Sequence, residues 1–170
     1  MNLQKLFDMQ RKLDEHIERE HPRQEDEDRL LKKILALQVE IAELANELPE
    51  VFKFWSHKKN NREKALEEFC DGLHFLLSVG LEITEPDMID LKRWNLTKAD
   101  NITEQFLWIM SDVTELYNGL CNDGFSKFDY EFLLLRFIHL GEMLGFSWEE
   151  VEEAYLQKNA ENHARQENGY

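Results

Sequence analysis

The chain has 170 residues, of which 42% are hydrophobic and 11% aromatic. This length suits one domain with a sizeable core, and the apolar content excludes an intrinsically disordered chain. The formal net charge is −15, so the surface repels nucleic-acid polymers and anionic membranes, and we expect neither as a partner. An acidic protein can still bind an anionic small molecule if divalent cations mediate the contact.

No apolar run is long enough to cross a membrane, and the N-terminus lacks a basic region followed by an apolar stretch. We therefore expect a cytoplasmic protein. The two cysteines, Cys70 and Cys121, lie far apart in apolar helical stretches, and we expect both to be buried free thiols.

Hydrophobic side chains recur three and four residues apart along most of the chain, which is the spacing of a helix with one buried face. In chain order this spacing predicts a helix over residues 2–19, an acidic break at 21–28 and a second helix from this break to residue 48. Further helices are predicted over residues 62–82, 86–94, 102–120, 128–144 and 147–166. Pro49 is expected to end the second helix and Gly145 the sixth. Seven Gly, three Pro and no strand alternation favour an all-α fold, a single-domain helical bundle over residues 1–170.

Two carboxylate pairs with a three-residue spacing lie on the second and third long helices: Glu40 with Glu43, and Glu68 with Asp71. Residues three apart share a helix face, and the residues between them are partly apolar, so both pairs lie near the core-facing side. If these helices pack antiparallel, four carboxylates converge. Their mutual repulsion favours a hard divalent cation, Mg²⁺ or Mn²⁺.

An acidic chain produces several pairs of this spacing by chance, so solvated surface acids are an open alternative. Asp112 with Glu115 is such a pair, and we interpret it as a solvated face or a faded echo of the first site.

These residues resemble the E-x-x-E … E-x-x-D signature of the all-α NTP pyrophosphatases, which include MazG-like enzymes, dCTP pyrophosphatases and dimeric dUTPases. Three further segments resemble the dimeric dUTPases: Met-Gln-Arg-Lys-Leu-Asp at 9–14, D-x-x-H-F at 71–75, and K-N-x-x-N-x-x-R-Q-x-x-G-Y at 158–170. The last is the most specific, and together the matches span nearly the whole chain. The sequence departs from that family at Asp14, where members often have Asn.

The resemblance implies Mg²⁺-dependent hydrolysis of dUTP to dUMP and pyrophosphate by a homodimer, with dUDP as a second candidate substrate. Two or more Mg²⁺ ions, or Mn²⁺, would be held by Glu40, Glu43, Glu68 and Asp71, with Glu43 as the base that takes a proton from the attacking water. Phosphate contacts are expected from Lys158, Asn162, Arg165, Tyr170 and Lys58. Base and sugar contacts are expected from Gln10, Asp14, Trp55, His74, Phe75 and Asn159, and His74 is also placed to orient a ligand carboxylate.

Uracil has an N3–H donor between two carbonyl acceptors, so Gln10 can donate to a carbonyl while Asp14 accepts from N3–H. Cytosine has a lone pair at N3 and would repel that carboxylate. Two alternatives stay open. One is a MazG-like or dCTP-directed pyrophosphatase with the same metal chemistry, against which the C-terminal motif argues, and the other is a non-catalytic helical interaction module.

Overall fold

The long helices begin where the sequence supplies a side chain that caps their first amides. The computed structural model describes residues 2–122 and 124–169. Its long helices are α1 (Leu3–Glu20), α2 (Arg29–Asn46), α4 (Arg62–Ile83), α5 (Ile102–Cys121), α6 (Lys127–Met143) and α7 (Trp148–Glu167). Each is preceded by a residue whose side chain accepts a hydrogen bond from a first-turn amide: Asn2, Asp28, Asn61, Asn101, Ser126 and Ser147. The all-α prediction is confirmed, with no strand among the described residues.

Two proline-containing segments differ from the sequence prediction. Pro49 does not end α2 directly but opens a short helix of its own, α3 (Pro49–Phe52), because proline fits the first turn of a helix. The helix predicted over 86–94 is instead two 3₁₀ turns, η1 (Pro86–Met88) and η2 (Leu91–Arg93). The backbone is extended at Ile89, and the Asp90 side chain accepts from the amide of Lys92, a local bond that competes with a continuous helix.

Gly145 ends the turn between α6 and α7 with φ of 75°, a left-handed conformation that glycine adopts without strain. Cys70 is buried, as predicted. The prediction of a buried thiol at Cys121 is wrong, because this residue is the last of α5 and its side chain is exposed.

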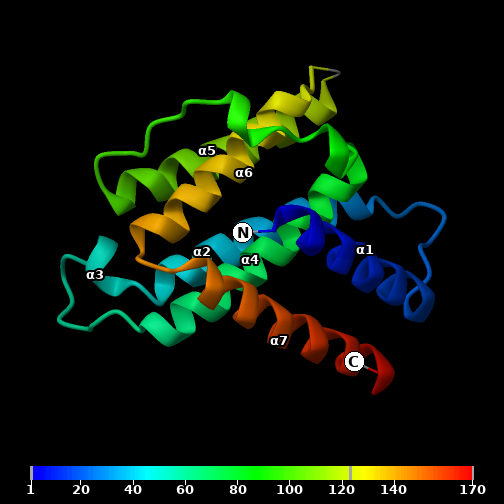
Figure 1. Ribbon diagram of the computed structural model, residues 1–170, viewed down its shortest axis with the longest axis horizontal. Coiled ribbons are helices and arrows are strands. Elements are labelled where there is room, and N and C mark those ends of the chain that lie inside the picture. The colour runs from blue at the N-terminus through cyan, green and yellow to red at the C-terminus, as the bar shows by residue number, and fades with distance from the viewer. Residues whose placement is uncertain (1, 123, 170) are drawn as a thin grey trace.

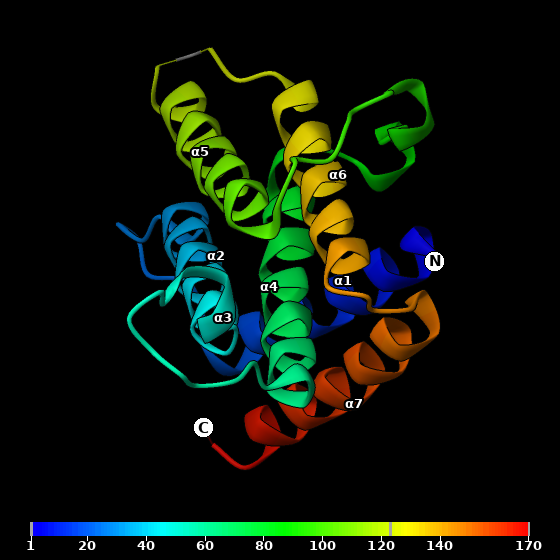
Figure 2. The same ribbon diagram turned by 90° about the vertical axis from the view of Figure 1, so that its left-hand side faces the viewer.

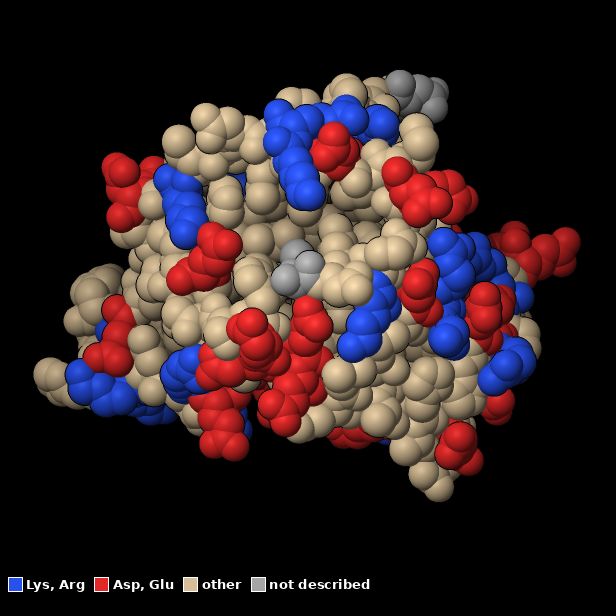
Figure 3. Space-filling model, viewed as in Figure 1, with Lys and Arg blue, Asp and Glu red and all other residues tan. Residues whose placement is uncertain are grey.

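Helix α4 lies at the centre of the bundle and packs against α1, α2, α6 and α7 (Figures 1 and 2). It is buried along most of its length, with Phe69 stacked on Phe137 of α6 at 4.5 Å between ring centroids. Helices α5 and α6 form a neighbouring pair, and α1 lies beside α7. No helix of the described residues is long and apolar enough to cross a membrane. Acidic side chains gather over the first turns of α7 (Figure 3).

Candidate active site

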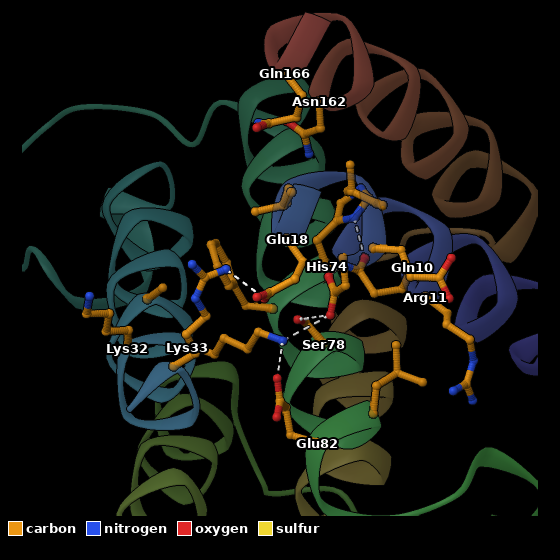
Figure 4. Close-up of a pocket in the computed structure, with 18 of the residues that line it drawn as sticks. Gln10, Arg11, Glu18, Lys32, Lys33, His74, Ser78, Glu82, Asn162 and Gln166 are labelled. Carbon is orange, nitrogen blue, oxygen red and sulfur yellow. Dashed lines mark hydrogen bonds and ion pairs between the residues drawn. The ribbon is translucent and has the colours of Figure 1, made fainter. Parts of the chain in front are cut away.

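A cavity of about 790 Å³ lies between α1, α2, α4 and α7. Figure 4 shows side chains from all four helices directed into it. Nine of the residues that the sequence analysis selected line this cavity: Gln10, Asp14, Glu40, Asp71, His74, Phe75, Lys158, Asn162 and Arg165. Residues from distant parts of the chain therefore meet around one space large enough for a nucleotide.

Three of the predicted carboxylates form one group, which we call the carboxylate cluster: Glu40 of α2 with Glu68 and Asp71 of α4. One oxygen of each lies within 4.8 Å of the others. The cluster forms because α2 and α4 run antiparallel: Lys33 near the start of α2 contacts Glu82 near the end of α4, and Glu40 lies beside Gly72. Its members are partly buried, so their oxygens face one another with limited access to water.

Glu43 is more exposed than the cluster and lies outside this group of three. Its charge nevertheless contributes to raising the pKa of both Glu40 and Glu68, so it lies near them as a fourth carboxylate.

The cluster holds more negative charge than its surroundings neutralise. Burial, followed by the charges of Asp71, Glu43 and Glu68, raises the pKa of Glu40 to about 7. Burial also raises the pKa of Glu68 and of Asp71. Hard oxygen donors crowded in this way are the ligands that Mg²⁺ and Mn²⁺ prefer, so the donor set fits a divalent cation.

Lys158 of α7 provides a cation that contacts the carboxylate cluster. Its ammonium lies 2.7 Å from Asp71 and 3.3 Å from Glu67. Burial alone would lower the pKa of Lys158, but the hydrogen bonds and charges of these two carboxylates raise it. Asn162 and Arg165 follow on the same helix and line the same cavity, so α7 provides one polar wall beside the cluster.

A second set of side chains, which we call the polar network, lies at the other end of the cavity, and all of them except the buried Tyr155 line it. Its members come from four helices: Gln10, Asp14, Lys33, His74, Ser78 and Tyr155. They are joined by hydrogen bonds of 2.6 to 3.0 Å. His74 uses Nδ1 to contact Gln10 and stacks on Tyr155 at 3.9 Å, instead of orienting a carboxylate of the cluster. Burial lowers the pKa of His74 to about 3, so the ring is neutral.

Other predicted contacts lie away from the cavity. Trp55 is 66% exposed and packs on Phe54 in the segment that joins α2 to α4, residues 50–61, which we call the connector; Lys58 is exposed in the same segment. Asn159 is buried in α7 and does not line the cavity. The prediction for Tyr170 lies outside the described residues.

The second acidic pair behaves differently from the first. Asp112 is half-buried and forms an ion pair with Arg136 of α6, while Glu115 is exposed. Among the described residues, only the carboxylate cluster brings three candidate ligands together. The interpretation of Asp112 as part of a solvated face is therefore wrong, since its carboxylate packs against α6.

A family model described as dUTPase matches residues 2–170 of the chain. The chain belongs to the dUTPase family. It is therefore a dUTP diphosphatase, a nucleoside-triphosphate pyrophosphatase acting on a small nucleotide, in a family that generally uses a divalent metal. A comparison with curated protein sequences gives no match. The family match favours this assignment over a MazG-like or dCTP-directed enzyme and over a non-catalytic interaction module.

Sequence reasoning missed three members of the polar network in this dUTPase: Lys33, Ser78 and Tyr155. A signal existed for Ser78, which follows His74 by one helical turn and so shares its face of α4. Lys33 precedes Glu40 by seven residues, which also places the two on one face of α2. Nothing in the spacing of Tyr155 relative to the C-terminal motif indicates that it contacts Gln10.

Proposed function

We propose that the protein hydrolyses dUTP to dUMP and pyrophosphate with Mg²⁺ held by Glu40, Glu68 and Asp71. The observation that carries this proposal is the approach of these three carboxylates to within 4.8 Å of one another, with Glu40 and Asp71 lining a cavity of nucleotide size. Mn²⁺ has the same preference for oxygen ligands and is expected to substitute. We expect two or more ions to bind, because the cluster and the nearby Glu43 provide four carboxylates.

When bound, Mg²⁺ would lower the pKa of a coordinated water and offset the charge of the phosphate oxygens. Glu43 lies outside the three-carboxylate group, so it is available to take the proton of the attacking water. Lys158 is positioned to bind phosphate oxygens once a metal takes its place beside Asp71. Arg165 and Asn162 on the following turns of α7 would add donors to the phosphates.

The base would bind at the polar network. Gln10 and Asp14 provide a donor and an acceptor at the cavity wall, and Phe75 provides an apolar surface beside them. His74 contacts Gln10 from the core side. This arrangement supports uracil as the preferred base, because uracil offers a carbonyl acceptor next to an N3–H donor.

We also propose a homodimer, located in the cytoplasm. Trp55 and Lys58 lie outside the cavity of their own chain, so a role for them in substrate binding requires the cavity of a second copy. The exposed aromatic side chains of the connector would then be covered by that copy.

The test is a panel of the four dNTPs, dUTP and dUDP with Mg²⁺, measured as release of pyrophosphate or phosphate. We expect dUTP to give the highest kcat/KM and EDTA to abolish turnover. Faster hydrolysis of dCTP than of dUTP would overturn the substrate assignment. Absence of pyrophosphate release from every substrate would support the interaction module instead.

A further inference from the structure

The carboxylate of Asp14 is surrounded by hydrogen-bond donors. Its Oδ1 accepts from the amide nitrogen of Gln10 at 2.7 Å. Its Oδ2 accepts from the hydroxyl of Ser78 at 2.6 Å and from the ammonium of Lys33 at 3.0 Å. The side chains of Asp14 and Lys33 are only 20% and 18% exposed, so this ion pair lies largely out of bulk water. Asp14 therefore faces the cavity as an acceptor.

The orientation of the Gln10 amide is fixed from the opposite side. Gln10 is 3% exposed, and its carbonyl oxygen accepts from the hydroxyl of Tyr155 and contacts Nδ1 of His74, both at 2.7 Å. With its oxygen directed into the core, the amide can present only N–H groups toward Asp14 and the cavity. A reversed amide would place the Gln10 oxygen against the Asp14 carboxylate.

The pair thus offers a fixed pattern of one donor and one acceptor. Uracil matches it with a carbonyl for Gln10 and N3–H for Asp14, whereas cytosine would place its N3 lone pair against the carboxylate. The pattern depends on the direction of the Asp14 oxygens, since the acceptor must point into the cavity beside the Gln10 amide. The positive charge nearest to Asp14 belongs to Lys33, which reaches from α2 toward Ser78 and Glu82 (Figure 4).

We propose that Lys33 is a specificity-determining residue of the base site. Its ammonium, 3.0 Å from Oδ2, fixes the orientation of the Asp14 carboxylate together with Ser78, and thereby makes the Gln10–Asp14 pair accept uracil and reject cytosine. Lys33 acts through Asp14, so it is a positioning residue and not a catalytic one. This inference rests on the proposed function insofar as it places the base at the polar network.

A purely structural role for Lys33 makes a different prediction. The same ammonium lies 2.8 Å from Glu82, so Lys33 also joins α1, α2 and α4 through two ion pairs. If it served only to hold these helices together, its loss would weaken the binding of uracil and cytosine nucleotides equally. The ratio of the two affinities separates the two roles.

The experiment compares dUMP and dCMP binding by calorimetry to the full chain and to the variants Lys33→Met and Lys33→Arg. We expect Lys33→Met to reduce the preference for dUMP by about tenfold or more, mainly through weaker dUMP binding, and Lys33→Arg to retain most of it. Lys12→Met on α1 is the matched control, because Lys12 is exposed and does not line the cavity. An unchanged preference in a folded Lys33→Met protein would overturn the inference.

A double-mutant cycle with Asp14→Asn checks the route of the effect. An amide at position 14 forms no ion pair with Lys33, so Lys33→Met should change the dUMP preference much less in the Asp14→Asn background. Equal effects in both backgrounds would mean that Lys33 does not act through Asp14.

Because dUMP binding needs no turnover, failure of the two proposals can be distinguished. A protein that prefers dUMP through Lys33 but hydrolyses no dUTP would refute the proposed function alone. A protein that hydrolyses dUTP with a preference insensitive to Lys33→Met would refute the present inference alone.

Discussion

At one end of the cavity three carboxylates lie within 4.8 Å of one another beside a single ammonium, whereas at the other end one carboxylate, Asp14, accepts hydrogen bonds from three donors. The first arrangement is unfavourable by itself, since burial and like charges raise the pKa of Glu40 to about 7. The second is internally satisfied. Negative charge that the protein leaves uncompensated indicates where a cation binds. A carboxylate whose charge is fully compensated by hydrogen-bond donors is instead held in one orientation, which suits it to recognise a ligand.

The largest expected effect comes from breaking the carboxylate cluster. We expect Asp71→Asn to reduce kcat for dUTP on the order of a thousandfold or more, because it removes a proposed metal ligand and the partner of Lys158. Helicity measured by circular dichroism should be unchanged. Glu63→Gln, at an exposed site on the same helix, is the control and should retain activity. Normal turnover by Asp71→Asn would remove this position from the active site.

At the polar network, removal of the buried imidazole should change the pH dependence of stability. The pKa of His74 is about 3 in the folded protein, against an ordinary value of 6.5, mainly because of burial. The unfolded chain therefore binds a proton more readily, and stability is lost as pH falls from 6.5 toward 3. At pH 5 this cost is about 2 kcal/mol.

His74→Gln keeps a donor beside Gln10 but cannot titrate in this range. Urea unfolding at pH 7 and pH 5 should show a smaller acid destabilisation in the variant than in the wild type. An identical loss in both proteins would contradict a neutral buried His74.

The carboxylate cluster should show the opposite pH dependence when the metal is removed. A folded pKa of about 7 for Glu40, above its ordinary 4.5, means that the folded state holds the proton more tightly. The stability that this group contributes is then present below pH 4.5 and lost as pH rises through 7. Since Glu40 is only about half buried and water screens its charge, the stability lost is about 1 to 2 kcal/mol.

The measurement is thermal unfolding in EDTA at pH 5 and pH 8. Glu40→Gln should be more stable than the wild type at pH 8, and the advantage should shrink at pH 5. Added Mg²⁺ should stabilise the wild type and not the variant. A variant that is less stable than the wild type at pH 8 in EDTA would show that the cluster is not strained by its charge.

The two ends of the cavity also differ in how far the sequence could predict them. Glu40, Glu68 and Asp71 could be found because their spacing is local to two helices, and only the antiparallel packing had to be assumed. The contacts of Asp14 join α1, α2 and α4, and no local spacing determines which turns of three helices meet. Helix positions followed from hydrophobic periodicity, except at 49–52, where Pro49 opens a short helix, and at 86–94, where Pro86 and Asp90 favour local turns.

The smallest expected effect on stability concerns the connector, which belongs to neither end of the cavity. Trp55→Ala should change the free energy of unfolding by less than about 0.5 kcal/mol, because its ring is 66% exposed and contacts the rings of Phe52 and Phe54 within the connector. If the connector of one copy reaches the cavity of another, the same variant should raise the KM for dUTP and weaken the dimer in analytical ultracentrifugation. Phe54→Ala, at 94% exposure in the same segment, provides a comparison. Unchanged KM and unchanged mass in both variants would leave the connector without a role in substrate binding and would place the whole site within one chain.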